Sequence, residues 1–276
     1  MEKVRWYYPS YTYLVPFDTS FVPIHAPFIM SSRLEMLEHF LRNPHAKTLQ
    51  TSFVHGGVDA DRNTAMMLAI KAENSAAFEL MLETTTDINA TNVKGVTALS
   101  LAAQKGRLSA CAALLNRGAL VDLPNHNGST PLIQASHFGF SETVDLLIRH
   151  NARVNTRNSK GTTALMRSAQ EGHGSVVACL LQCRCDVNAR NEDGMNALML
   201  GSQRGHANIV AVLIEHGASI DGRTVQGSTA LMLSCKRGHL DVVQTLLCAG
   251  AEVAVKDSKG RTARDQASCE FTHLNI

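Results

Sequence analysis

Three histidines recur at a fixed interval. His173, His206 and His239 are each separated by 33 residues. A histidine beside a nucleophile serves as a general base, and two or three histidines together bind a transition metal. Neither task calls for one copy of the residue every 33 positions, whereas a structural role in a repeated turn does. The spacing therefore predicts that these histidines support the architecture.

The cysteines include one cluster that raises the question of a metal site. Of the seven cysteines, Cys179, Cys183 and Cys185 lie close together, but no second pair stands nearby in the sequence. Structural zinc sites use two such pairs, or a cysteine pair with a histidine pair. Because the count is odd and no pairing pattern exists, we predict reduced thiols, no bound metal and no cofactor. Reduced thiols are typical of a cytoplasmic or nuclear protein.

No catalytic motif is present. The chain has no phosphate-binding loop of the G-x-x-x-x-G-K-[ST] type, no H-E-x-x-H and no G-x-S-x-G. The repeated turn carboxylates, such as Asp186 and Asp221, suit turn formation better than general acid catalysis. We predict that the chain is not an enzyme and has no catalytic residues.

A longer phrase surrounds the repeated histidines. "GTTALMRSAQEGH" begins at Gly161, "GMNALMLGSQRGH" at Gly194 and "GSTALMLSCKRGH" at Gly227. The same register extends back to Gly128 and Gly95. A period of this length, kept over many copies, is typical of a solenoid of stacked supersecondary units.

Each copy predicts two short helices and a turn-rich connection. A threonine two residues after the glycine is suited to cap the first helix, with Asn196 in that place once. Glycines such as Gly172 and Gly205 then end this helix, as a left-handed C-terminal position requires. The second helix has apolar spacing and ends at glycine or asparagine. One unit cannot bury its apolar faces alone, so neighbouring units must stack.

The pattern resembles the ankyrin repeat. "TPLIQA" begins at Thr130, "TALMLS" at Thr229 and the turn "CDVNA" at Cys185, and the resemblance covers about residues 59–270. The signature histidine of the family is replaced by methionine in four copies, for example Met166 and Met199. The resemblance implies an all-α solenoid of helix-turn-helix units with short hairpin turns, a concave protein-binding face and no catalytic activity.

The register divides the chain into segments. We expect an extended or disordered aromatic and proline-rich leader, then a degenerate N-terminal capping helix and loop, six full repeats, and a partial C-terminal repeat or cap. These segments span residues 1–30, 31–58, 59–91, 92–124, 125–157, 158–190, 191–223, 224–256 and 257–276. The leader is either a short linear motif or a segment without a role, and its residues do not separate the two.

The composition excludes two classes of partner. The net charge is only +2 and charged residues make up 18%, which does not indicate a nucleic-acid-binding protein. No apolar run approaches the length of a membrane span, and the N-terminus does not resemble a secretory signal. We therefore expect a monomer that binds a protein partner, with neither nucleic acid nor membrane involved.

One register position carries positive charge in four successive copies. It is occupied by Arg157, Arg190, Arg223 and Lys256. Stacked helices lie about 8–10 Å apart, and an extended peptide advances about 3.3 Å per residue. The row therefore predicts an extended, acidic partner with a carboxylate or phosphate at about every third residue. The alternative is a solvated row, neutralised by nearby carboxylates such as Glu192.

Further candidates for the concave face lie at the end of the first helices. Arg204 and Arg237 add positive charge there, and His137 and Phe138 hold the same place in a middle copy. An exposed phenylalanine at this place is a candidate hot spot. The alternative is that Phe138 only packs against Phe140.

The family resemblance also implies a modification. Asn188, preceded by Asp186, Val187 and a leucine at 180, matches the turn asparagine that a cytosolic dioxygenase hydroxylates in some ankyrin repeats. The alternative is that Asn188 only shapes the turn.

The leading functional prediction is a non-catalytic scaffold or adaptor that docks a protein partner on its concave face. The alternative is the regulatory or targeting segment of a larger enzyme, such as a kinase or ubiquitin ligase, of which this chain is a fragment or isoform.

Overall fold

The computed structural model describes residues 61–267. This part contains twelve α-helices, one 3-10 turn and no β-strand. The elements are α3 (Ala65–Lys71), α4 (Ser75–Thr84), α5 (Ala98–Gln104), α6 (Leu108–Asn116), α7 (Pro131–Phe138), α8 (Ser141–Arg149), α9 (Ala164–Glu171), α10 (Gly174–Leu181), α11 (Ala197–Arg204), α12 (Ala207–Glu215), α13 (Ala230–Arg237), α14 (Leu240–Cys248) and η1 (Arg264–Gln266). The predicted all-α repeat solenoid is confirmed. The predicted leader 1–30 and capping segment 31–58 lie outside the described residues.

The chain forms two compact units, which meet between Val93 and Lys94. The described part of the first unit is the helix pair α3 and α4, which buries Met67 and Phe78. Its flanking segments are joined by a hydrogen bond from the Val93 N–H to the Asp61 carbonyl (2.9 Å). This pair has the same helix-turn-helix form as the units that follow.

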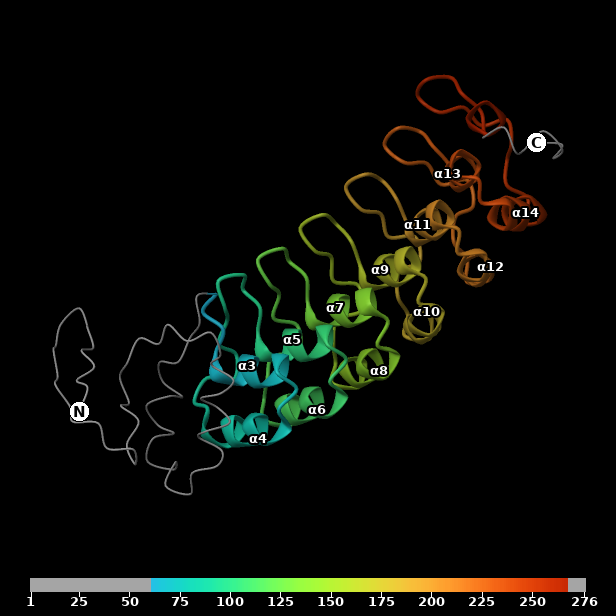
Figure 1. Cartoon of the computed structure of the whole chain (residues 1–276). Helices are drawn as coiled ribbons and strands as arrows, with labels where there is room; N and C mark the ends of the chain where they lie inside the picture. Colours follow the sequence, from blue (N-terminus) through green and yellow to red (C-terminus); the bar gives the residue numbers. More distant parts are fainter. Residues whose placement is uncertain (1–60, 268–276) are drawn as a thin grey trace, which may run out of the picture. The chain divides into compact units, whose positions relative to one another are not determined.

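The second unit is a stack of helix pairs. The first helices α5, α7, α9, α11 and α13 form one row, and α6, α8, α10, α12 and α14 form a second row beside it (Figure 1). Hairpin loops project from the side of the first row (Figure 1). Side chains on the first helices and on the hairpins therefore share one face of the unit.

A side-chain cap fixes the start of each first helix. The Thr163 hydroxyl accepts a hydrogen bond from the Met166 N–H (3.3 Å), and the same bond recurs at Thr229 with Met232 (3.4 Å). At the exceptional copy the Asn196 amide oxygen accepts from the Met199 N–H (3.0 Å), so asparagine fills the role. Loss of such a cap typically costs about 1 kcal/mol.

The methionines that replace the signature histidine belong to the core. Met166, Met199 and Met232 are each at most 1% exposed. Their flexible thioether chains fill the space between successive first helices, where a polar ring would need a hydrogen-bond partner. The departure from the family signature thus leaves the stacking intact.

Backbone hydrogen bonds join the hairpins edge to edge. The Glu192 N–H donates to the Lys160 carbonyl (3.1 Å), and the Val225 N–H donates to the Asp193 carbonyl (2.9 Å). The same bond joins each neighbouring pair of hairpins from residue 94 to residue 258. A hairpin contributes two chain segments, each about 4.8 Å wide, so one repeat advances by about 9.6 Å. This step agrees with the usual spacing of packed helices, about 8–10 Å.

The last described segment is short. After Asp257 the chain forms another hairpin and then the 3-10 turn η1, which packs on α13. The Asp265 carboxylate accepts hydrogen bonds from the Thr262 N–H and hydroxyl (both 2.8 Å). Polar groups therefore close this turn, where the other copies have an α-helix. The division of the chain into nine segments stays a prediction.

A left-handed residue follows each second helix in the second unit. Gly118, Gly217 and Gly250 have φ between 81° and 85°, and Asn151 has φ 64°. Arg184 occupies the same register position with φ 52°. A side chain with a Cβ is strained in this conformation by about 1–2 kcal/mol. The third helix pair of this unit thus carries a local strain that the repeats ending in glycine avoid.

Replacing Arg184 with glycine is therefore expected to stabilise the protein by about 1 kcal/mol. The matched reverse change is Gly217→Arg, where no heavy atom lies within 4 Å of an added Cβ, so its cost comes from the backbone alone. Urea unfolding would measure both. A destabilised Arg184→Gly variant would show that contacts of the arginine side chain outweigh its backbone strain.

Candidate protein-binding site

The predicted row of arginines is anchored to its own hairpins. The Nε–H groups of Arg157, Arg190 and Arg223 donate to the carbonyls of the glycines four residues later, at 3.2, 3.0 and 3.3 Å. All three arginines are exposed. The left-handed glycines hold these carbonyls in the same place in each hairpin. The carbonyls therefore orient the three guanidinium groups in the same way.

Two of these arginines also connect neighbouring repeats. Nη2 of Arg157 donates to the carbonyl of Arg190, and Nη2 of Arg223 donates to the carbonyl of Lys256. Each bond spans 33 residues, which is one repeat. The row is therefore part of the stacking as well as part of the surface. Sequence reasoning missed this role, since a carbonyl acceptor leaves no trace in the side-chain pattern.

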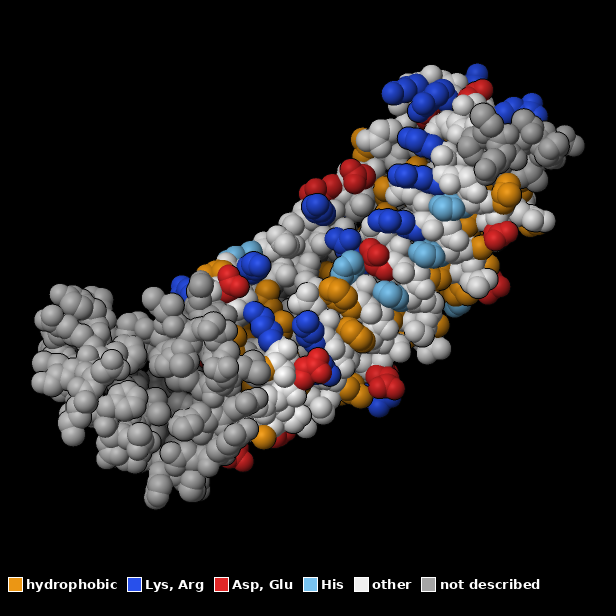
Figure 2. Space-filling model, viewed as in Figure 1, with side chains coloured by type: hydrophobic (Ala, Val, Ile, Leu, Met, Phe, Trp, Pro, Cys, Tyr) orange, Lys and Arg blue, Asp and Glu red, His pale blue; other side chains and the backbone are white. Residues whose placement is uncertain are grey.

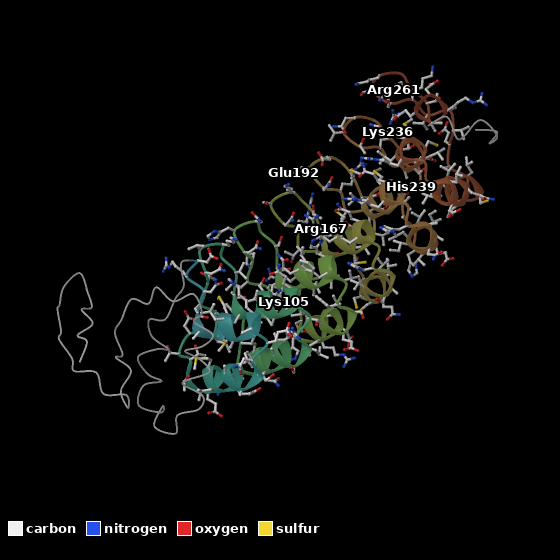
Figure 3. All side chains as sticks on the ribbon, viewed as in Figure 1. Lys105, Arg167, Glu192, Lys236, His239 and Arg261 are labelled. Carbon is white, nitrogen blue, oxygen red and sulfur yellow. The ribbon has the colours of Figure 1, made fainter. Side chains whose placement is uncertain are left out.

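The row keeps its positive charge. Its hydrogen-bond acceptors are neutral carbonyls, and no carboxylate of the described residues lies within ion-pair distance of Arg157, Arg190 or Arg223. Glu192 stands at the tip of its hairpin (Figure 3) and forms no ion pair with a described residue. Neutralisation by neighbouring carboxylates is therefore not seen in this part of the chain.

Asp257, next to Lys256 in the sequence, faces elsewhere. Its Oδ1 accepts the Arg261 N–H (2.9 Å) and the Lys259 N–H (2.8 Å), and its Oδ2 pairs with the Arg261 guanidinium (2.8 Å). The hydrogen bond from the Arg261 N–H is the largest cause that lowers the pKa of Asp257 from 3.8 to about 2, and burial opposes it. The Asp257 carboxylate therefore stabilises the turn in which it lies and forms no ion pair with Lys256.

Further cations lie at the end of the first helices. Arg204 ends α11 and Arg237 ends α13, and both are exposed. Figure 2 shows Lys and Arg side chains gathered along this side of the second unit, and Figure 3 shows Lys236 and Arg167 among them. Glu171 holds the same register position in α9, so the series of positive charges at the helix ends is interrupted there by a negative one. Basic residues therefore occupy this position in α11 and α13, and Lys105 occupies it after α5.

His137 and Phe138 lie at the end of α7. Burial is the largest cause that lowers the pKa of His137, and the nearby Glu171 carboxylate (3.7 Å from Nδ1) opposes it. His137 is thus mostly uncharged at neutral pH and does not extend the cationic row. Phe138 is 42% exposed and its ring stacks beside Phe140, with centroids 6.5 Å apart. Phe138 therefore packs on Phe140 and remains exposed, and its role as a hot spot for a partner stays a prediction.

The repeated histidines have structural contacts. Nε2 of His173, His206 and His239 lies 2.9, 3.2 and 3.1 Å from a carbonyl of the preceding repeat. A carbonyl only accepts hydrogen bonds, so each Nε2 carries the proton in this arrangement. These hydrogen bonds between neighbouring repeats agree with the predicted structural role of the histidines.

Asn188 bridges two repeats. Its Oδ1 accepts the Ser219 N–H (2.8 Å), and its Nδ2 donates to the Gly217 carbonyl (3.0 Å). The Asp186 carboxylate accepts the Asn188 N–H (3.0 Å). The turn-shaping interpretation therefore has a physical basis, and hydroxylation of Asn188 stays a prediction.

Two of the cysteine thiols, Cys111 and Cys235, are buried. Burial raises the pKa of Cys111 to about 12 and that of Cys235 to about 11, so both are protonated. Among residues 61–267 no group of three or more histidine, cysteine or acidic side chains is arranged to hold a metal ion. In the same range no helix is long and apolar enough to cross a membrane.

The fold and the face just described define a class, the stacked-repeat proteins that present hairpins and first helices to a partner. A family model for ankyrin repeats (three copies) matches residues 29–125, 117–191 and 169–257. The chain belongs to the ankyrin repeat family, whose repeats are protein-interaction modules and are generally non-catalytic.

Among solved structures, the chain is similar to the crystal structure of the human ASB11 ankyrin repeat domain. The TM-score is 0.70 at 21% identity, and the match covers 75% of this chain and 93% of that chain. This likeness concerns the fold. A comparison with curated protein sequences gives no significant match.

The arginine bridge between repeats makes a stability prediction. Removing Arg223 with Arg223→Ala is expected to destabilise the protein by about 1 kcal/mol, because hydrogen bonds to two hairpins are lost. Arg237→Ala, which removes an exposed arginine for which no bond to a described residue is seen, is expected to change stability by less than about 0.5 kcal/mol. Equal effects in urea unfolding would contradict a bridging role.

The lowered pKa of Asp257 predicts a pH effect. Above about pH 5 the carboxylate is ionised in the folded and unfolded states, and its full stabilisation is present. As the pH falls through 3.8 towards 2, the unfolded chain binds the proton first, so this stabilisation is lost. Asp257→Asn is expected to give a shallower fall of unfolding free energy over this range.

Arg261→Gln provides the control for that measurement. It removes the ion pair but keeps the Arg261 backbone N–H, the largest cause of the shift. Its pH dependence should lie between those of the natural protein and Asp257→Asn. A slope that Asp257→Asn leaves unchanged would contradict the assignment.

Proposed function

We propose that this chain is a binding scaffold for an extended, acidic segment of a partner protein, held along the row Arg157, Arg190, Arg223 and Lys256. The observation that carries the proposal is the set of three guanidinium groups held in one orientation by neutral carbonyls. A cation fixed without a carboxylate keeps its charge for a ligand and loses less conformational entropy on binding.

The remaining donors suit an oxyanion. A guanidinium group has five N–H donors, and the hydrogen bonds to described residues use two in Arg157 and Arg223 and one in Arg190. At least three donors of each group therefore remain for a carboxylate or phosphate, which accepts two parallel bonds from arginine. Lysine would supply charge without this planar geometry.

The spacing selects an extended segment. Successive hairpins are about 9.6 Å apart when each adds two chain segments. Three residues of an extended peptide cover about 10 Å. A partner in the extended polyproline II form places every third side chain on the same side, so an acidic residue at every third position would meet one cation per repeat. Acidic residues at every second position would be about 3 Å out of step at the first repeat.

A synthetic peptide tests the proposal. (Glu-Ser-Gly)5 is expected to bind the folded protein more tightly than (Glu-Ser)5 followed by five glycines, which has the same length and charge, measured by fluorescence anisotropy. The double variant Arg190→Gln and Arg223→Gln should weaken binding about tenfold. Binding should also weaken with added salt, because the pairs are exposed.

The matched control removes the same charge from the other side of the stack. Arg117 and Arg149 lie at the end of the second helices α6 and α8, and their double glutamine variant should bind the peptide like the natural protein. Circular dichroism would first establish that both variants are folded. Equal losses in the two variants, or no preference for three-residue spacing, would refute the proposal.

A further inference from the structure

One turn of the stack is apolar where the others are polar. Phe138 holds the register position that is charged in the neighbouring copies, namely Lys105, Glu171, Arg204 and Arg237. Phe140 holds the position of His173, His206 and His239. Phe138 is the only aromatic residue among the exposed large hydrophobic residues of the described chain.

The two rings form a surface with the preceding repeat. An added Cβ at Gly106 would lie 2.4 Å from Cδ1 of Phe140, so this ring rests directly on the backbone at the end of α5. Leu108, two residues further on, is 36% exposed. The Phe138 ring lies beside Phe140 with an interplanar angle of 22°. Phe138 and Phe140 form what we call the aromatic patch.

Positive charge borders the aromatic patch. Lys105 follows α5 and is exposed, and Arg167 lies on α9 (Figure 3), while α7 packs between these two helices. Glu171 is also on this side, with its carboxylate 3.7 Å from Nδ1 of the mostly uncharged His137, so it keeps its negative charge. The two cations Lys105 and Arg167 still outweigh this one carboxylate, which favours acidic residues in the partner beside an apolar side chain seated on the patch.

We propose that the aromatic patch seats one apolar side chain, tryptophan or leucine, of the same acidic partner. This inference rests on the proposed function, which it extends from a charge pattern to a defined motif. The basic row supplies charge-dependent attraction, and the aromatic patch supplies an apolar anchor that resists salt. Anchors of this kind carry much of the energy of protein interfaces.

The positions of the two sites set the length of the motif. Phe138 ends a helix of eight residues, so it lies about 12 Å from the hairpin side of its own repeat. Arg157 belongs to the next hairpin, about 10 Å further along the stack. The direct separation is therefore about 16 Å, which an extended linker of about five residues covers.

The position of the aromatic patch relative to the basic row also determines which end of the partner segment carries the apolar residue. The patch precedes the Arg157 end of the basic row, and no corresponding patch follows the Lys256 end within the described residues. One end of the acidic segment is therefore suited to carry the apolar residue, and the other end is not.

The test uses three peptides built on (Glu-Ser-Gly)5. One is unmodified, one carries tryptophan at the N-terminus through a five-residue Gly-Ser linker, and one carries it at the C-terminus through the same linker. We expect one of the tryptophan peptides to bind about tenfold more tightly than the unmodified peptide. The gain should persist when added salt weakens all three.

Variants of the protein locate the gain. Phe138→Ala should abolish it while leaving the affinity of the unmodified peptide unchanged, since Phe138 is outside the basic row. Leu240→Ala is the matched control, because Leu240 is 45% exposed at the register position of Leu108, in the last full repeat. It should keep the gain.

The outcomes separate the two proposals. Failure of the unmodified peptide to bind would refute the basic row. Normal binding of that peptide with no gain from tryptophan, an equal gain at both ends, or a gain that survives Phe138→Ala would overturn the aromatic anchor alone.

Discussion

The structure depends on the contact between the end of one first helix and the ring that follows the next one. An added Cβ at Gly172 would lie 2.6 Å from Cε1 of His206, and one at Gly205 would lie 2.7 Å from Nδ1 of His239. The rings therefore require glycine beneath them, and the glycines in turn have the positive φ that ends the helix. Since the same ring donates to a carbonyl of that neighbour, one residue sets both the distance and the register between repeats.

This constraint separates the residues that stack from those that are free to vary. The residues that hold neighbouring repeats together offer little for recognition. They are the capping threonines, the left-handed glycines and, in several repeats, the buried methionines and bridging histidines. The residues beside them on the hairpins and at the helix ends face outward. The arginines belong to both groups, because Arg157 and Arg223 join hairpins through one side of the guanidinium and keep donors on the other. Recognition and stacking are therefore coupled at these positions.

Much of the fold was predictable because it depends on local chemistry. Helix caps such as Thr163, left-handed ends such as Gly172 and the apolar faces of the helices are each encoded within a few residues, and the period extends them along the chain. The candidate site was harder to predict from the sequence. The row of Arg157, Arg190 and Arg223 could be located by register. The hydrogen bonds of these arginines to backbone carbonyls could not be predicted, because they depend on backbone geometry and not on residue type. The strain at Arg184 was missed for a related reason, since an arginine gives no sign of a positive φ.

The ladder of backbone bonds between hairpins has a mechanical consequence. Peptide hydrogen bonds hold neighbouring hairpins at a fixed step, whereas no backbone hydrogen bond joins neighbouring second helices among the described residues. Bending of the second unit is therefore accommodated mainly by splaying or closing the second row of helices. The length of the hairpin side therefore stays nearly constant during bending. The cations on the hairpins keep their mutual spacing while the unit bends.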